Sequence, residues 1–339
     1  MNQNWKNFLL DQNALFKSES DITFKEHCHD NANNNKIYPI AHLAVLKIGG
    51  ADAVKLLQGQ VTCNVNEVTE TKSSLGALCT PKGRAITTFL LIKTPDYFLM
   101  VLPRELLEIV QKRLQMYVLR SAVTLTNCSD QLCLIGLSES GRQTECLFDT
   151  RQINGNDIRI NFSKTEARHL IITEPDQAIK LWSVAINEQN FIATNSEQWR
   201  YKDLLSGLPW LTTETTEEFI PQMLNLDQLG GISYNKGCYT GQEIVARTHY
   251  LGKTKRGLFL AECNSDTLPN PNSPILDKNA ETEQVLAKVL IALPSTSMMK
   301  ENQNNITMLI VLQSSEDNQY NLTLNDANKT PVYLLAHSL

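Results

Sequence analysis

Short apolar runs recur along the chain, and Pro and Gly turn signals or stretches of helical periodicity separate them. The runs at 44–48, 75–80, 85–92 and 97–102 predict strands, most of them in antiparallel hairpins. Apolar residues spaced by three and four after Pro103 predict a helix over 104–118. Further strands are expected at 123–125, 132–137, 158–160 and 169–173, with helices at 138–148, 176–186 and 195–205. This β-β-α order is typical of the α+β class.

The 339 residues are enough for two or three compact domains. Residues 1–36 are polar and include the run Asn33-Asn34-Asn35, so we expect them to form an N-terminal extension with at most a short helix. Residues 37–255 carry the α+β pattern. Residues 256–339 contain several strand-like runs without clear helices, and they predict a small C-terminal β-barrel.

Charge and cysteine content limit the class of protein. The chain has 31 Lys and Arg against 36 Asp and Glu, for a net charge of −5, so no global field attracts nucleic acid. No apolar run reaches the roughly 20 residues of a membrane helix, and no signal core is evident, so we expect a cytoplasmic protein with no membrane partner. Eight cysteines without a CxxC pair predict mostly buried thiols.

Four glycines lie close together in one segment, at positions 230, 231, 237 and 241. Such crowding indicates positive φ angles or a close approach of the backbone to a ligand or another element. Thr240 and Glu243 have the spacing of a capping box, which predicts a helix starting at Gly241. The run matches neither a phosphate-binding loop nor a dinucleotide-binding fingerprint.

Cys238 precedes that predicted helix start, where the helix dipole and Lys236 would both favour the thiolate. The alternative is an inert, buried cysteine. Between 236 and 256, Lys236, Arg247, Lys253, Lys255 and Arg256 face a single acidic residue, Glu243. This excess of positive charge predicts a local anion site, and the alternative is a solvated helix face.

The run Lys236-Gly237-Cys238-Tyr239-Thr240-Gly241-Gln242-Glu243 closely resembles the signature of the YgfZ family of folate-binding, tRNA-modification-associated proteins. Asn225-Leu226, Gly230-Gly231-Ile232, Leu57-Gln58-Gly59-Gln60-Val61-Thr62, Lys82-Gly83-Arg84 and Phe219-Ile220-Pro221-Gln222 are similar to the family at matching places. This family is related to the aminomethyltransferase (T-protein) of the glycine cleavage system. The resemblance covers residues 38–262 well.

The resemblance implies a three-domain ring of the aminomethyltransferase type, with tetrahydrofolate or a folate derivative bound in a central channel and a C-terminal β-barrel. It further implies support of iron–sulfur enzymes, including those that thiomethylate tRNA, as partners. The family's functional cysteine falls on Cys238, and one folate-contacting tryptophan falls on Trp199. An indole stacks well on a flat pterin, although a helical tryptophan is also a common core residue.

On this hypothesis Cys238 is the functional thiol and Lys236 lowers its pKa. The expected folate-binding residues are Trp199, Gly230, Gly231, Gly237, Tyr239, Gly241, Gln242, Glu243 and Arg247. No metal site is expected, because His27-Cys28-His29-Asp30 are adjacent residues that do not aim at one ion.

Two positions depart from the related proteins. The second folate-contacting tryptophan of the family aligns with Leu43, so one stacking face is missing. The catalytic aspartate of the T-protein is replaced by Thr87 and Thr88, which removes the group that would polarise the folate amine. We therefore expect no aminomethyl transfer. The alternatives are a one-carbon transferase with an unrecognised acid, and a module whose basic face contacts tRNA directly.

Overall fold

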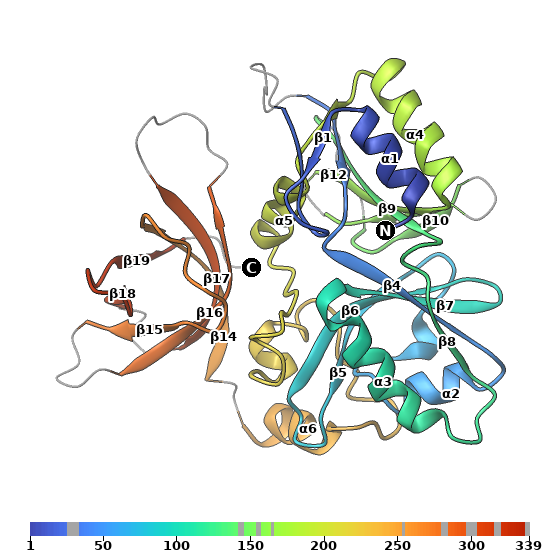
Figure 1. Cartoon of the computed structure of the whole chain (residues 1–339). Coiled ribbons are helices and arrows are strands. Elements are labelled where there is room, and N and C mark those ends of the chain that lie inside the picture. The colour runs from blue at the N-terminus through green and yellow to red at the C-terminus, as the bar shows by residue number, and fades with distance from the viewer. Residues whose placement is uncertain are drawn as a thin grey trace. The chain divides into compact units, whose positions relative to one another are not determined.

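The computed structural model describes residues 1–25, 34–141, 146–153, 157–163, 166–252, 255–278, 284–295, 304–314 and 320–335 (Figure 1). The chain divides into two compact units. Unit 1 comprises Met1–Gly76 and Phe89–Arg200, and unit 2 comprises Ala77–Thr88 and Tyr201–Leu339. Each unit is described by itself below.

One sheet of unit 1 has the strand order β10-β11-β12-β9-β3-β13. Its strands are β3 (Lys36–Pro39), β9 (Cys133–Glu139), β10 (Thr150–Gln152), β11 (Ile158–Asn161), β12 (Ala167–Thr173) and β13 (Ile192–Ala193). Neighbours pair antiparallel except β13, which pairs parallel with β3. The helices α4 (Pro175–Asn187) and α5 (Ser196–Leu205) follow β12 in the chain.

The expected helix over 138–148 is wrong. Ser138 and Glu139 continue β9, and Ser138 is paired with Lys36 on one side and Arg168 on the other. Gly141 then takes a φ of +72°, which no helix contains, and residues 142–145 lie outside the described residues. Pairing with the two flanking strands therefore sets the conformation of Ser138 and Glu139, and the local sequence does not.

The N-terminal residues are part of the core of unit 1, which corrects the expected polar extension. They form α1 (Gln3–Asp11), capped by the Asn2 side chain, and a hairpin of β1 (Ala14–Phe16) and β2 (Ile22–Phe24). Helix α1 lies beside α4 (Figure 1). Trp5 meets Trp182 edge to face with ring centroids 5.5 Å apart, and Phe24 stacks on Trp182 at 5.8 Å. Residues 26–33 lie outside the described residues.

The second sheet has the order β5-β6-β7-β4-β8. Its strands are β4 (Leu43–Gly49), β5 (Ser74–Cys79), β6 (Ala85–Lys93), β7 (Tyr97–Pro103) and β8 (Thr124–Asn127). The helices α2 (Ala53–Gln58) and α3 (Leu107–Val118) and the 3-10 turns η1 (Val65–Glu67) and η2 (Arg104–Leu106) connect them. Residues 77–88, which include the β5–β6 turn, belong to unit 2.

The C-terminal strands close into a barrel in the order β14-β17-β16-β15-β18-β19, which confirms the expected barrel. They are β14 (Arg256–Asn264), β15 (Pro274–Asp277), β16 (Val285–Pro294), β17 (Asn305–Gln313), β18 (Leu322–Leu324) and β19 (Pro331–Leu334). Alternate residues of β17, from Ile306 to Leu312, join one apolar cluster. The period-2 pattern of these runs thus fills the barrel interior.

Candidate functional site

The glycine-rich segment of unit 2 lies between a 3-10 turn, η3 (Pro221–Leu224), and the helix α6 (Gln242–Leu251). Gly230 has a φ of +74° and Gly241 a φ of +85°, so the expected positive φ angles are confirmed at two of the four glycines. Gly231 is buried, whereas Gly237 is exposed with open space around it.

Gly241 and Gly83 allow the β5–β6 turn to touch the start of α6. A Cβ on Gly241 would lie 2.5 Å from the Thr80 carbonyl oxygen and 3.0 Å from Gly83 Cα. A Cβ on Gly83 would lie 2.8 Å from Ile244 Cβ. Both glycines are needed because two backbones meet here without room for side chains. This contact places Lys82-Gly83-Arg84 directly against the end of the glycine-rich segment.

The start of α6 differs from the expected capping box by one residue. Gly241 occupies the N-cap position in a left-handed conformation, and it has no side chain to cap the helix. A reciprocal contact comes instead from Gln242, whose Oε1 accepts a hydrogen bond from the Tyr239 amide at 3.2 Å. The close contact with Thr80 decides the register, because the left-handed turn fits only at the glycine.

Other residues tie the segment to its surroundings within unit 2. The buried Gln222 donates from Nε2 to the Val245 carbonyl at 2.6 Å. Asn225 donates to the Leu258 carbonyl at 3.2 Å and accepts from the Leu258 amide at 3.1 Å, and it thereby holds the segment to β14. The Phe219 carbonyl accepts from the Ala85 amide at 2.8 Å. The family-like motifs around 219–226 therefore hold the segment in place through these hydrogen bonds.

Cys238 lies on this glycine-rich segment and is exposed. Lys236 and Tyr239 are both buried, and the Lys236 ammonium lies 5.0 Å from the centre of the Tyr239 ring. This is the geometry of a cation–π contact, which fixes the lysine against the segment. Exposure argues against the alternative of an inert, buried thiol. The activation of this thiol by Lys236 stays a prediction.

The remaining cysteines behave mostly as expected. Five of the seven described cysteines are buried: Cys63, Cys79, Cys128, Cys133 and Cys263. Burial raises the pKa of Cys79 and of Cys133 to about 12 and that of Cys263 to about 11. Cys146 is the other exposed thiol within the described residues.

Trp199 lies in unit 1 and is fully buried. Tyr38 and Phe162 contact its ring with centroids 5.5 and 5.8 Å away, and the Arg168 guanidinium lies 4.8 Å from its centre. Its indole N–H has no hydrogen-bond partner in the described part of the chain. In this conformation the ring packs as a core residue, which favours the second of the two alternatives for this tryptophan.

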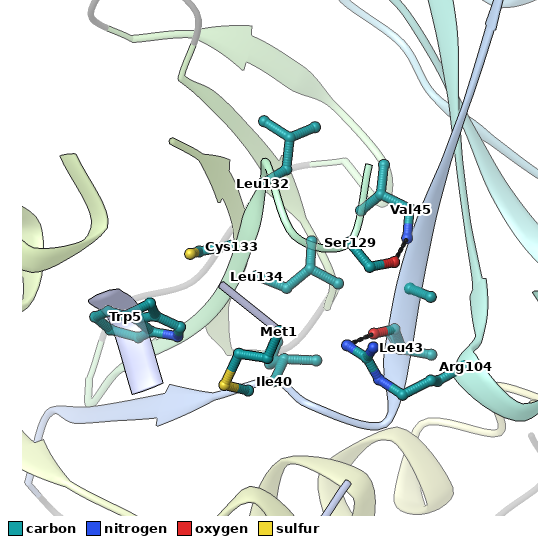
Figure 2. A pocket seen from close by; sticks show the side chains of 11 residues that line it. Met1, Trp5, Ile40, Leu43, Val45, Arg104, Ser129, Leu132, Cys133 and Leu134 are labelled. Atoms are coloured by element: carbon teal, nitrogen blue, oxygen red, sulfur yellow. Dashed lines mark hydrogen bonds between the residues drawn. The ribbon is translucent and has the colours of Figure 1, made fainter. Parts of the chain in front are cut away.

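A small cavity in unit 1 is lined by residues from the N-terminus and from the starts of β4 and β9 (Figure 2). Leu43, the position that aligns with a family tryptophan, is among them, whereas none of the expected folate-binding residues is. Arg104 donates to the Leu43 carbonyl at 3.3 Å, and the Val45 amide donates to Ser129 Oγ at 3.3 Å. These polar groups therefore already hold the backbone around the cavity.

Thr87 and Thr88, which stand in place of the catalytic aspartate of the T-protein, are both buried on β6. Thr88 Oγ1 donates to the Pro209 carbonyl at 2.5 Å, and Thr87 Oγ1 donates to the Thr88 carbonyl at 3.0 Å. Both hydroxyls thus serve the local structure, and neither can supply a carboxylate.

The basic cluster is partly described. Arg247 and Lys255 are exposed and Arg256 is half-buried, while Lys253 lies outside the described residues. Sequence reasoning missed three neighbouring aromatic residues, Tyr234, His249 and Tyr250, whose rings gather here. Adjacent aromatic residues at the end of an amphipathic helix were the available signal, but the partner Tyr234 comes from within the glycine-rich segment, before α6 begins.

Metal and membrane features are absent from the described part of the chain. No group of three or more His, Cys, Asp or Glu side chains there is placed to hold a metal ion. His27-Cys28-His29-Asp30 lie outside the described residues. Among the described helices, none has both the length and the apolar character that a bilayer crossing requires.

Together, these elements define a protein of the aminomethyltransferase fold that carries an exposed cysteine on a fixed, glycine-rich segment. The fold is similar to that of the glycine cleavage system aminomethyltransferase T from Bartonella henselae, with a TM-score of 0.77, 12% identity, and coverage of 100% of this chain and 97% of that one. At this identity the likeness shows the fold alone.

Sequence comparison gives the family. The chain is 33% identical over 243 residues to the tRNA-modifying protein YgfZ of Colwellia psychrerythraea, covering 68% of this chain and 72% of that protein. It is 30% identical over 305 residues to the protein of the same name from Enterobacter sp., covering 87% and 91%. The chain therefore belongs to the YgfZ family. No protein-family model matches it.

Proposed function

We propose that the protein binds tetrahydrofolate or a related folate and supports iron–sulfur enzymes, and through them the modification of tRNA. The observation that carries the proposal is the exposed Cys238 on a segment held by Gln222, Asn225 and Gly241. Membership of a family named for tRNA modification supports it, and so does the fold of an aminomethyltransferase.

Cys238 is the residue through which we expect the protein to act on its partners. The thiol is exposed next to Gly237, around which the space is open, and the hydrogen bonds of Gln222 and Asn225 hold the segment in place. The buried hydroxyls of Thr87 and Thr88 favour an accessory role over aminomethyl transfer, because that reaction requires a group that polarises the folate amine.

The first experiment tests the thiol in cells that lack the endogenous protein. The Cys238→Ala variant should fail to restore tRNA thiomethylation, measured by mass spectrometry of tRNA nucleosides. Cys146→Ala is the matched control, because Cys146 is also exposed and lies outside the segment. Full restoration by Cys238→Ala would remove the functional thiol from the proposal.

The second experiment measures tetrahydrofolate binding by calorimetry. Because the Trp199 ring is covered on its sides by Tyr38, Phe162 and Arg168, folate stacking on it requires this part of the core to open. Trp199→Phe should weaken binding, whereas Trp182→Phe should not, although both indoles are fully buried and lack a hydrogen-bond partner among the described residues. No binding by the unmodified protein would limit the proposal to the thiol.

A further inference from the structure

Three aromatic rings form a cluster at the C-terminal end of α6. Tyr234 and His249 stack face to face, with ring centroids 3.7 Å apart and planes inclined by 13°. Tyr250 meets His249 edge to face at 4.8 Å and lies 6.2 Å from Tyr234. We call Tyr234, His249 and Tyr250 the aromatic platform.

One ring of the platform is hydrogen-bonded to a buried residue, and the other two are exposed. The Tyr234 hydroxyl accepts a hydrogen bond from Gln222 Nε2 at 3.5 Å, and the same nitrogen bonds the Val245 carbonyl of α6. His249 is exposed, and Tyr250 is 63% exposed. His249 and Tyr250 therefore present ring surface to solvent beside Tyr234, which is held by Gln222.

The sequence that carries the platform is rich in positive charge. Residues 242–256 contain Arg247, Lys253, Lys255 and Arg256 against the single acidic Glu243, in a chain whose net charge is −5. Arg247 precedes Tyr250 by three residues on α6, which places the two side chains next to each other on the helix surface. Arg247 is exposed, as is Lys255. Planar rings beside cations on an exposed surface are the combination that binds bases by stacking and phosphates by charge.

We propose that the aromatic platform binds unpaired nucleotides of an RNA. The bases stack on His249 and Tyr250, and the backbone phosphates contact Arg247 and Lys255. A free pterin or nucleotide fits this surface less well, because small molecules are usually held in concave sites, whereas His249 and Tyr250 are exposed. The inference goes beyond the proposed function and does not depend on folate binding.

The test is fluorescence anisotropy of a labelled single-stranded RNA of about eight nucleotides with the full chain at roughly 50 mM salt. Tyr250→Ala should weaken binding about tenfold, and Tyr250→Phe should restore it, because stacking requires the ring and not the hydroxyl. Arg247→Gln should lower the slope of log affinity against log salt by about 0.7, the value for one phosphate of a single strand.

Tyr333→Ala is the matched control, since Tyr333 of β19 is 61% exposed and lies outside the platform. It should bind RNA like the unmodified protein. The proposal is overturned if the single strand does not bind, if Tyr250→Ala binds it unchanged, or if a blunt RNA duplex of the same sequence binds as tightly. Loss of tetrahydrofolate binding in Tyr250→Ala would also overturn it, because the platform would then be a pterin site.

Discussion

The ring of Trp199 lies directly against the backbone of Gly136 on β9, so that a Cβ on Gly136 would be 2.6 Å from Trp199 Cζ3. The φ of Gly136 is not in the left-handed region, and the requirement for glycine is therefore one of space. Strand β9 is flanked by β12 and β3, which leaves the backbone little freedom to shift.

Gly136→Ala should lower the free energy of unfolding by about 1–3 kcal/mol or more, because the added methyl group must displace a fully buried indole. The measurement is urea unfolding followed by circular dichroism. Gly237→Ala provides the control, since the space around Gly237 is open. Equal stability of the two variants would show that the Trp199 ring moves easily. Such movement is what folate stacking on this ring requires.

Replacement of Trp5 should be costly although it lies near the N-terminus. Its side chain is buried between α1 and α4 and contacts Trp182, so Trp5→Ala should reduce stability by about 3–5 kcal/mol. Leu15→Ala, at a 56% exposed position of β1, should change it by less than about 0.5 kcal/mol. Similar midpoints in thermal unfolding would mean that the N-terminal residues are not part of the cooperative core.

The glycines at the two ends of the segment should differ in their tolerance of alanine. Gly230→Ala meets open space and should cost about 1–2 kcal/mol, for the left-handed conformation alone. Gly241→Ala has the same conformational cost and also a contact with Thr80, so it should be the more damaging variant. Denaturant titration of both variants checks the order, and the reverse order would contradict the close approach of the β5–β6 turn.

Stability should fall as the pH is lowered from about 7 to about 5. Burial, and then the positive charge of Arg159, lower the pKa of His169 from 6.5 to about 4, with Glu139 acting in the opposite direction. As the pH falls, the unfolded chain therefore binds a proton at His169 before the folded chain does. The resulting loss of stability develops between pH 6.5 and 4. Between pH 7 and pH 5, the shift of His169 alone accounts for a loss of about 2 kcal/mol.

The comparison is of urea midpoints at about pH 7 and about pH 5. His169→Gln should have a smaller difference between the two than the unmodified protein. Some dependence should persist, because burial and the charges of Arg200 and Arg104 also hold the pKa of His42 well below 6.5. An unchanged difference in His169→Gln would show that His169 is protonated in the folded protein.

Native alkylation should distinguish the cysteines by exposure. Iodoacetamide at neutral pH should modify Cys238 and Cys146 within minutes, because both are exposed. Cys79, Cys133 and Cys263 should react only after unfolding, since each is buried and has a pKa of about 11 to 12. Peptide mass spectrometry gives the sites, and early labelling of Cys79 would indicate that the contact between the β5–β6 turn and α6 opens.

Much of the secondary structure could be predicted from local pattern. The strands β4 to β7, the helices α3 and α4 and the strands of the barrel other than β15 follow from apolar periodicity and turn residues, because both act between residues that are close in the chain. The helix expected at 138–148 was wrong for the converse reason. Its first residues pair with Lys36 and Arg168, and no local pattern contains those partners.

The sequence by itself determined the α+β class, the C-terminal barrel and the segment that holds Cys238, because the residues that encode them are contiguous. Tertiary structure alone decided that Trp5 belongs to the core, that α6 begins after Gly241, and that Tyr234 stacks on His249. Each of these depends on a contact between distant residues. Such contacts arise when apolar surface is buried and backbones approach, and the three-dimensional path of the chain sets which residues meet.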